Sequence, residues 1–389
     1  MRLAIIGDRG IPARYSGFST LVEQLAVRLV EEHAIEVTVY CRTHYYDERE
    51  PVWHGVHRVF LPAPGGKSFE SLIHSTLSIV HAIFGRYDVI FVLDPGNAPL
   101  CWPLRLRRWP VVIHTDGLGW KRRKWSRLQR AYYRWSERLS AWIADWLVTD
   151  SRAMQRYYAD EYGVRSSFIP YSGEVGPPPS DEGLKRFALE PGGFYLVVAR
   201  LEPENNVDLI IREYRATSCA RPLVVVGGNP YGTPYAQAIL NQSDQRIRCV
   251  DAVWDAGVLN GLYANCYCYL HGHEVGGTNP SLLRAMQAGA PCVVVDVEFT
   301  REVVGEEGLL FGKAPGELAA LLSKIEDTPS ELARRGAALQ ARASAEYRWD
   351  AIAAAFTTLF RTLLDDRRAG GKHDPLNVYH PHDFPTTAP

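Results

Sequence analysis

Apolar and polar positions alternate along this chain in the pattern of strands and helices that take turns. Short apolar runs that indicate buried strands are each followed by a segment with apolar residues at helical spacing. In the first half of the chain, the strand-like runs lie at 2–7, 35–41, 87–93, 109–115, 144–150 and 167–172. In the second half, they lie at 194–200, 222–228, 246–253, 266–273 and 292–295. This order predicts an α/β fold with parallel, doubly wound sheets.

A proline-rich segment interrupts this pattern, which then restarts. With 389 residues, the chain is too long for one hydrophobic core. We therefore predict two Rossmann-like domains, at 1–172 and 184–345, joined by a linker at 173–183. A long amphipathic helix is predicted at about 343–366, and its residues 346–366 are expected to return to the first domain. Residues 367–389 are expected to form a loose tail.

The stretch HGHEVGGTNPSLLRAMQAGAPCVVVD, residues 271–296, contains the clearest local signals. Asn279 suits an N-cap and Pro280 suits the first helical position. Gly289 can end this helix in the left-handed region, and a buried strand follows. A glycine turn that leads into a helix start is a site for anions. An ordinary loop–helix–strand unit is the alternative interpretation.

Composition describes a folded protein with few clues about partners. Hydrophobic content is 46% and the formal net charge is -1, so no overall electrostatic partner is implied. The seven cysteines lie mostly in apolar runs, which predicts buried, reduced thiols in the cytoplasm. The N-terminus enters a strand directly, and no apolar run reaches the roughly 18 residues of a membrane span. We therefore expect no signal peptide and no spanning helix.

Five fragments, taken in order, carry a resemblance to a known family. They are GDRGIPARYSGF (7–18), DGLGWKRRKW (116–125), RLEPENN (200–206), HEVGGTNPSLL (273–283) and AMQAG (285–289). The chain resembles the retaining family 4 glycosyltransferases, which have the GT-B fold. Its closest likeness is to the rhamnosyltransferase-like branch that carries an N-terminal domain of unknown function. The resemblance covers the chain to about residue 365.

The resemblance implies transfer of a sugar from a nucleotide diphosphate donor, with retention of anomeric configuration. It implies no cofactor and no obligatory metal. The C-terminal domain would hold the donor and the N-terminal domain the acceptor. In two doubly wound domains, we expect these sites at the carboxyl ends of the sheets, facing a cleft.

Arg200 is the first candidate for catalysis, because it follows a predicted strand and can fork onto the leaving diphosphate. Stabilising that departing charge is the main demand of the reaction. A surface ion pair with Glu202 or Glu204 is the alternative. The wider family places a lysine shortly after this arginine, whereas Asn205 here offers a neutral hydrogen bond.

Other donor contacts follow from the resemblance alone. Phosphate oxygens would receive bonds from Gly276, Gly277, Thr278, Asn279, Ser281 and Leu282. Asp251 and Val253 fall in the loop that contacts the base, and Gly17 would allow close approach to the diphosphate. His271 and His273 are candidates for the sugar hydroxyls, with a structural role for one of them as the alternative.

One departure from the family concerns the ribose contact. The wider family keeps two glutamates eight positions apart, which fall here on Gly276 and Arg284. Replacing an acceptor-only carboxylate by a donor-only guanidinium reverses the local charge. Arg284 could use ribose oxygens as acceptors, bind an acidic feature of an atypical donor, or mark weakened activity. Glu302 is a nearby family-like position that could pair with Arg284 or take over its acidic role.

Candidates for the acceptor side lie at strand ends in the first half. Asp116 occupies the position where many family members carry histidine, and its carboxylate could stabilise an oxocarbenium-like state or orient the acceptor hydroxyl. A turn role for Asp116 and Gly117 is the alternative. Asp94, His114 and Trp120 are further acceptor-side candidates, although His114 also fits a packed strand residue.

A basic, tryptophan-rich stretch favours a membrane surface as partner. Residues 121–147 are predicted to form a basic amphipathic helix, which binds anionic headgroups through its cationic side. Its contact residues would be Lys121, Arg122, Arg123, Lys124 and Trp125. A helix with one buried face and one solvated basic face is the alternative. No recognition fold accompanies the basic residues, so nucleic acid is not expected as a partner.

We therefore interpret the sequence as a glycosyltransferase of the hexosyltransferase type, peripheral on the cytoplasmic face of the membrane. Its substrate would be a glycan or lipid-linked acceptor of polysaccharide synthesis, and the sugar is L-rhamnose in the branch it resembles. Two other interpretations fit the same residues: a catalytically silent membrane-binding or assembly subunit, and another nucleotide-sugar enzyme such as an epimerase.

Overall fold

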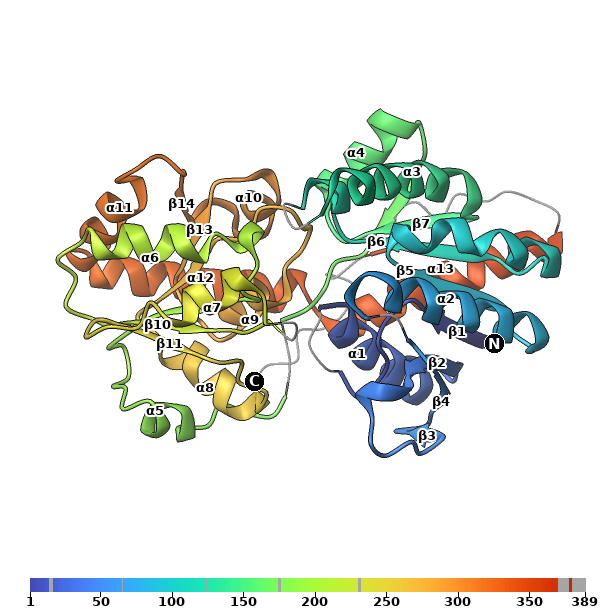
Figure 1. Ribbon diagram of the computed structural model, residues 1–389, viewed down its shortest axis with the longest axis horizontal. Coiled ribbons are helices and arrows are strands. Elements are labelled where there is room, and N and C mark those ends of the chain that lie inside the picture. The colour runs from blue at the N-terminus through green and yellow to red at the C-terminus, as the bar shows by residue number, and fades with distance from the viewer. Residues whose placement is uncertain are drawn as a thin grey trace. The chain divides into compact units, whose positions relative to one another are not determined.

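A computed structural model describes residues 1–13, 17–64, 66–122, 125–173, 176–229, 232–369 and 378–379. The chain forms two compact units, each built on one mainly parallel sheet (Figure 1). The first holds Met1–Trp120, Trp125–Tyr171 and the last helix, and the second holds Ser172–Arg348. This is the predicted α/β, doubly wound architecture.

The sheet of the first unit has eight strands. In spatial order they are β3 (Val52–Trp53), β4 (Val56–Leu61), β2 (Glu36–Arg42), β1 (Arg2–Ile6), β5 (Val89–Leu93), β6 (Val111–Thr115), β7 (Trp146–Thr149) and β8 (Ser166–Phe168). β3 pairs antiparallel with β4, and every other pair is parallel. Parallel strands end at one edge, so the loops that follow β1, β5 and β6 meet there.

Helices cover this sheet and include the last helix of the chain. They are α1 (Gly17–Glu31), α2 (Gly66–Phe84), α3 (Arg127–Ile143), α4 (Arg152–Tyr162) and α13 (Trp349–Ala369), with the 3₁₀ segments η1 (Thr43–Tyr45), η2 (Pro95–Arg107) and η3 (Gly119–Lys121). Phe356 of α13 packs on Phe91 of β5 with ring centroids 5.2 Å apart. The amphipathic face of α13 is thus buried in the first unit.

Two helix bounds predicted from the sequence are wrong. α13 begins at Trp349, because α12 (Pro329–Glu346) occupies the earlier residues and the chain breaks helical conformation at Tyr347. The basic helix begins at Arg127 rather than residue 121, because Ser126 and Gln129 form a capping box. It ends at Ile143, where the chain turns into β7.

The second unit has a six-stranded parallel sheet. Its order is β11 (Ile247–Val250), β10 (Leu223–Val226), β9 (Tyr195–Val198), β12 (Cys268–His271), β13 (Cys292–Val295) and β14 (Leu309–Phe311). Its helices are α5 (Glu182–Arg186), α6 (Val207–Arg215), α7 (Pro234–Leu240), α8 (Ala256–Asn265), α9 (Pro280–Gln287), α10 (Glu298–Val304), α11 (Glu317–Glu326) and α12, with η4 (Pro203–Asn205) and η5 (Gly305–Glu307).

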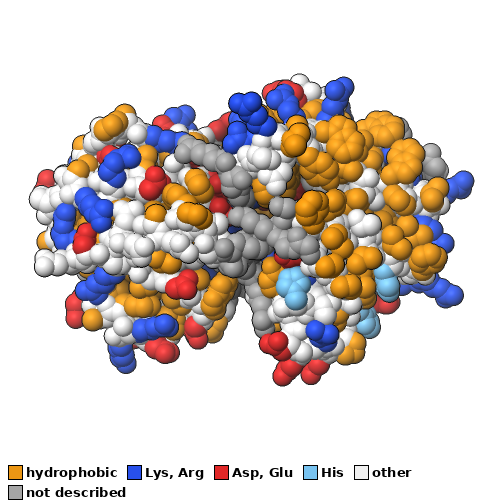
Figure 2. Space-filling view, in the orientation of Figure 1, with side chains coloured by type: hydrophobic (Ala, Val, Ile, Leu, Met, Phe, Trp, Pro, Cys, Tyr) orange, Lys and Arg blue, Asp and Glu red, His pale blue; other side chains and the backbone are white. Residues whose placement is uncertain are grey.

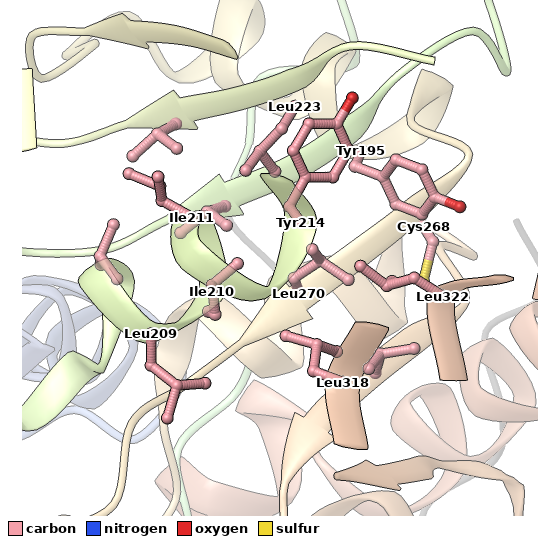
Figure 3. Close-up of a cluster of buried hydrophobic side chains, with 14 of the residues drawn as sticks. Tyr195, Leu209, Ile210, Ile211, Tyr214, Leu223, Cys268, Leu270, Leu318 and Leu322 are labelled. Carbon is pink, nitrogen blue, oxygen red and sulfur yellow. The ribbon is translucent and has the colours of Figure 1, made fainter. Parts of the chain in front are cut away.

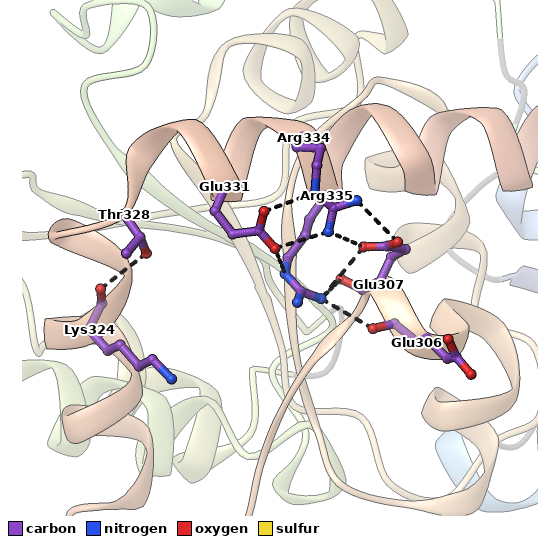
Figure 4. A network of polar contacts seen from close by, with 7 residues as sticks. All are labelled: Glu306, Glu307, Lys324, Thr328, Glu331, Arg334 and Arg335. Carbon is purple, nitrogen blue, oxygen red and sulfur yellow. Dashed lines mark hydrogen bonds and ion pairs between the residues drawn. The ribbon is translucent and has the colours of Figure 1, made fainter.

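One face of this sheet packs against α6 and α11 in a dense apolar core (Figure 3). Ile210 and Tyr214 of α6 and Leu318 and Leu322 of α11 are buried around Leu270 of β12. At the surface, Arg334 and Arg335 of α12 bind Glu307 of η5 at 3.0 Å and 3.6 Å (Figure 4). Such exposed ion pairs stabilise a fold little, so the buried apolar surface carries most of the stability.

The described part of the predicted linker packs on the second unit. Ser180 N–H donates to the carbonyl of Gly257 at 3.0 Å, and Asn260 Nδ2 donates to the carbonyl of Pro177 at 2.7 Å. A Cβ placed on Gly173 would lie 2.2 Å from the carbonyl carbon of Leu283. A proline-rich composition indicates a spacer, but here one backbone and one side-chain hydrogen bond hold the segment against α8.

Two expectations from composition can be compared with the structure. All seven cysteines are free thiols, and six of them are buried, as predicted. Among the described helices, none is both long and apolar enough to cross a bilayer.

Candidate functional site

The start of α9 has the cap that the sequence predicts. The side chain of Asn279 accepts the N–H of Ser281 at 3.0 Å, and Pro280 is the first helical residue. Gly289, beyond the helix end, has a φ of +77°. Tyr269 of β12 anchors this start to the sheet, because its hydroxyl lies 3.0 Å from Ser281 Oγ and 3.1 Å from the carbonyl of Val198. The helix start is therefore fixed at the carboxyl edge of β9 and β12.

Two of the predicted phosphate contacts are already used inside this cap. Ser281 N–H binds the Asn279 side chain, and Leu282 N–H donates to the Asn279 carbonyl at 3.1 Å. A phosphate could reach these two donors only by breaking the cap. The prediction therefore rests on the preceding residues, of which Thr278 and Gly277 are buried.

A short hydrogen-bonded chain links the strand end at Arg200 to the loop after β12. Asn205 Nδ2 donates to the Arg200 carbonyl at 2.6 Å, and Asn205 Oδ1 lies 2.6 Å from His273 Nδ1. Because Oδ1 only accepts, Nδ1 carries the proton, and Nε2 of a neutral His273 ring is an acceptor. A Cβ on Gly276 would lie 2.5 Å from this Nε2. Asn205 thus orients His273, a role that the sequence did not suggest.

The position of the His273 ring therefore requires a glycine at 276. A side chain there would collide with the imidazole of His273. The neighbouring loop is tied down as well: Asn206 Nδ2 donates to the Gly272 carbonyl at 2.8 Å, and Lys313 pairs with Glu274. A preorganised loop of this kind holds its groups in place before a ligand binds.

Arg200 itself is half-buried at the end of β9. The alternative that Arg200 pairs with Glu204 is wrong, because the fully buried carboxylate of Glu204 has no partner among the described residues. Asp251 and Val253 follow β11 on the same edge, and Asp251 lies beside Gly228 at the end of β10. Their contact with a base stays a prediction, as does the approach of a diphosphate to Gly17, where α1 begins.

In the structure, the guanidinium of Arg284 is bound by residues of α8. Its Nε donates to Asn260 Oδ1 at 2.5 Å and its Nη2 to the Ala256 carbonyl at 2.8 Å, both in α8. Burial lowers the pKa of its guanidinium. The expected pairing with Glu302 is wrong, because Arg284 binds α8 instead. Glu302 lies beside Arg342, which donates to its backbone carbonyl at 3.1 Å.

In the first unit, three aspartates follow three neighbouring strands. Asp8, Asp94 and Asp116 come after β1, β5 and β6, at the carboxyl edge. Asp94 accepts the N–H of Gly96 at 2.7 Å, and buried Asp8 accepts from Ser19 Oγ at 2.9 Å. Asp116 is half-buried, which is compatible with its predicted role. Asp8 was not singled out from the sequence, and in the structure its carboxylate binds Gly10 N–H and Ser19 Oγ within its own loop.

The structure favours the packed-strand interpretation of His114 over a role on the acceptor side. Its ring is fully buried among the rings of Phe18, Phe91, Tyr171 and Phe356, and neither nitrogen has a hydrogen-bond partner among the described residues. Trp120 remains half-buried beneath the guanidinium of Arg134, which lies 4.9 Å from its ring centroid. The His114 ring therefore fills the core of the first unit, and the role of Asp116 stays a prediction.

Burial of His114 makes the first unit sensitive to acid. Desolvation lowers the pKa of His114 to about 3, whereas the unfolded chain has an ordinary histidine value near 6.5. Between these values the unfolded state binds a proton that the folded state does not. The free energy of unfolding should therefore fall as pH falls from about 6.5, by about 1.4 kcal/mol per pH unit for this group.

We expect the free energy of unfolding of His114→Phe to depend less on pH than that of the wild type, by the His114 contribution. Urea unfolding measured across about pH 5–7 would show the difference. His271 and His74, whose pKa values burial lowers to about 3 and about 4, would still contribute. Exposed His57 supplies the control, and His57→Phe should keep the wild-type slope. An unchanged slope in His114→Phe would contradict the assignment.

The predicted membrane residues fall only partly within the described chain. Arg123 and Lys124 lie outside the described residues. Lys121 is exposed at the end of η3, Arg122 is half-buried, and Trp125 stacks on Tyr133 with centroids 5.4 Å apart. Lys121, Arg122 and Trp125 precede α3, which begins at Arg127, so these three residues are not part of the predicted amphipathic helix. Among the described residues, no group of three or more His, Cys, Asp or Glu could hold a metal ion.

Comparisons with known proteins agree with this architecture. The model of the glycosyl transferase 4-like domain matches residues 16–171, and that of glycosyl transferases group 1 matches residues 194–328. No curated protein sequence matches the chain.

Solved structures show the same fold at low sequence identity. Sucrose-phosphate synthase (tll1590) from Thermosynechococcus elongatus matches with a TM-score of 0.79 and 17% identity, over 94% of this chain and 99% of that one. Anabaena Alr3699/HepE in complex with UDP and glucose matches with a TM-score of 0.73 and 16% identity, over 93% and 100%. The predicted GT-B fold is thus confirmed. Both matched family models describe glycosyltransferase domains, one in each half of the chain.

Proposed function

We propose that this chain is a retaining glycosyltransferase that binds a nucleoside diphosphate sugar in its second unit. The observation that carries the proposal is the convergence of Arg200, His273 and the N-terminus of α9 at one sheet edge, joined through Asn205 and Tyr269. A cation, a helix start and an imidazole acceptor are what a sugar diphosphate needs. Anabaena Alr3699/HepE was solved with UDP-glucose, which supports a nucleotide-sugar donor.

In this proposal, the bond between the anomeric carbon and the diphosphate oxygen breaks, and the acceptor hydroxyl oxygen bonds that carbon from the same face. Arg200 and the start of α9 stabilise the charge that develops on the diphosphate. His273 Nε2 accepts a hydrogen bond from a sugar hydroxyl, because Asn205 holds its other nitrogen as the donor. The acceptor hydroxyl passes its proton to the departing diphosphate oxygen, which lies on the same face, as the new bond forms.

The first unit would bind the acceptor near Asp116, Asp94 and Trp120. Asp116 would orient the attacking hydroxyl or stabilise positive charge at the anomeric carbon. We propose a glycan or lipid-linked acceptor of cell-surface polysaccharide synthesis, reached at the inner face of the membrane. L-Rhamnose is the proposed sugar because the fragments at 7–18 and 273–283 resemble the rhamnosyltransferase-like branch.

A donor panel tests the proposal directly. Melting-temperature shifts with UDP, dTDP, GDP and CDP would identify the base, and release of nucleotide diphosphate from the matching sugars would identify the donor. We expect one diphosphate to stabilise the protein well above the others, because bases are contacted specifically. No shift with any diphosphate, together with no hydrolysis of any donor, would refute the proposal.

A catalytically silent subunit is the second candidate, and Arg284 is the observation that favours it. The guanidinium stands where the wider family keeps a ribose-binding carboxylate, and it is bound to α8. Losing a charge-assisted contact of about 1.5–3 kcal/mol would weaken nucleotide binding by one or two orders of magnitude. The variant Arg284→Glu separates the two candidates. If the wild-type protein hydrolyses no donor, and the variant binds diphosphate more tightly and gains donor hydrolysis, the silent-subunit candidate is favoured.

A further inference from the structure

Helix α3 buries its polar side and exposes its apolar side. Ser136, Glu137 and Ser140 are buried, and the carboxylate of Glu137 accepts hydrogen bonds from the hydroxyls of Tyr157 and Tyr162, both at 2.6 Å. The outward side carries Leu128, Trp135 and Trp142, which are 83%, 54% and 64% exposed. Hydrogen bonds within the fold satisfy the buried polar side of α3. Packing within the unit therefore does not account for the large apolar residues on its exposed side.

The exposed apolar surface continues over two neighbouring elements. Trp102 of η2 stacks on Trp142 of α3 with ring centroids 5.7 Å apart, and Tyr132 of α3 donates to the Gly96 carbonyl in η2 at 2.8 Å. Arg107 of η2 reaches the carbonyl of Gly85, directly after α2. The α2–η2–α3 face consists of Phe69, Leu77, Val80, Phe84, Trp102, Leu106, Leu128, Trp135 and Trp142. Figure 2 shows hydrophobic side chains gathered over this part of the first unit.

The exposed charges on α2, η2 and α3 have one sign, although Glu161 of neighbouring α4 pairs with Arg134 at 3.3 Å. The only acidic residues of α2, η2 and α3 are Glu70 and Glu137, and both are buried. The exposed arginines of η2 and α3 are Arg105, Arg107, Arg127, Arg130, Arg134 and Arg138. Apolar patches of this kind on a protein surface mark interaction sites, and the arginines select an anionic partner.

We propose that the α2–η2–α3 face docks on the surface of an anionic lipid bilayer. Tryptophan suits the boundary between headgroups and acyl chains, because its ring is apolar and its N–H is polar. A symmetric dimer through the same face would bring two arginine-rich surfaces together, and their like charges would repel. The inference deepens the proposed function by naming the surface that would bring the enzyme to a lipid-linked acceptor. Its link to that acceptor rests on the proposed function, whereas the docking itself rests on the exposed residues alone.

Flotation with vesicles of phosphatidylcholine, with and without phosphatidylglycerol, tests the apolar part of the face. The protein should float with the anionic vesicles, and the double variant Trp102→Ser, Trp142→Ser should bind them at least about ten-fold more weakly, since each buried ring contributes apolar area. Trp254→Ser is the matched control, because Trp254 is 65% exposed in the second unit. Equal flotation of both variants would overturn the proposal.

The charged part of the face has its own control. Arg127→Gln with Arg138→Gln should weaken binding to anionic vesicles by roughly 20–30-fold, since each basic residue contributes about five-fold near such a surface. Lys185→Gln with Arg186→Gln removes two exposed charges of α5 and should change binding little. Binding should also fall as salt is added.

Two further outcomes decide between partners and between proposals. A dimer in sedimentation velocity that Trp102→Ser, Trp142→Ser dissociates, with no flotation of the parent, would identify a second copy as the occupant and overturn the bilayer. Hydrolysis of a soluble donor needs no membrane. A protein that floats with the vesicles but hydrolyses no donor would therefore refute the proposed reaction alone. Absence of flotation with intact hydrolysis would refute the docking face alone.

Discussion

Replacing Arg200 by alanine is expected to lower the rate of donor cleavage, as kcat/KM, by about 10²–10³-fold, which is the usual effect of removing one donor aimed at developing negative charge. Arg200 follows β9, at the edge where Asn205, His273 and the start of α9 converge. Its guanidinium would neutralise the diphosphate as the glycosidic bond breaks. The assay is release of nucleotide diphosphate from the donor identified by the panel.

Two variants separate this role from a structural one. Arg200→Lys keeps the charge but loses the two-pronged geometry, so it should recover part of the rate. Arg212→Ala removes an exposed arginine from α6 in the same unit and should change the rate by no more than about two-fold. Full activity in Arg200→Ala would contradict the role proposed for Arg200 at the donor site. If Arg200→Ala loses thermal stability and the fall in folded protein accounts for the fall in activity, Arg200 has a structural role.

Phe356→Ala is expected to destabilise the first unit by about 3–5 kcal/mol, the usual cost of removing a buried phenylalanine ring. Phe356 is fully buried in α13 and contacts the rings of Phe91 and Phe360 at 5.2 Å and 5.7 Å. Helix α13 thus completes the core of a unit whose other residues lie more than 170 positions earlier.

Urea unfolding, followed separately from nucleotide binding, would measure this effect. The unfolding transition of the first unit should shift to lower urea, while a diphosphate should still stabilise the second unit, because α13 lies in the first. Phe84→Ala provides the control: Phe84 is 84% exposed in the same unit, so its loss should change stability by at most about 0.5 kcal/mol. A parallel loss of diphosphate binding in Phe356→Ala would contradict the assignment of α13.

The start of α9 shows how far local sequence determines local structure. Asn279, Pro280 and Gly289 each adopt the conformation predicted for them, because a cap, a fixed φ and a left-handed glycine need no distant partner. Ser126 and Gln129 carried an equally local signal for the start of α3, and the basic run at 121–124 obscured it. Helix ends are predictable where capping chemistry is read before charge.

The candidate site could be predicted from the sequence only in part. That Arg200, Asp116 and Asp94 follow strands was evident from the chain. Parallel strands bring Asp94 and Asp116 to one edge of the first sheet and Arg200 to the carboxyl edge of the second. The link between Asn205 and His273 joins residues 68 positions apart, and no spacing predicts it. Arg284 was identified as a departure from the family, but only packing against α8 decided where its charge goes.

The sequence by itself therefore determined the α/β class, the two-part division, the parallel strands and the cap of α9, because hydrophobic period and backbone chemistry act over a few residues. Tertiary structure decided that His114 is core, that Arg284 binds α8 and that α13 packs on β5. It also left the apolar side of α3 facing outward. Burial is set by which surfaces meet, and a residue's own neighbours in sequence do not specify that.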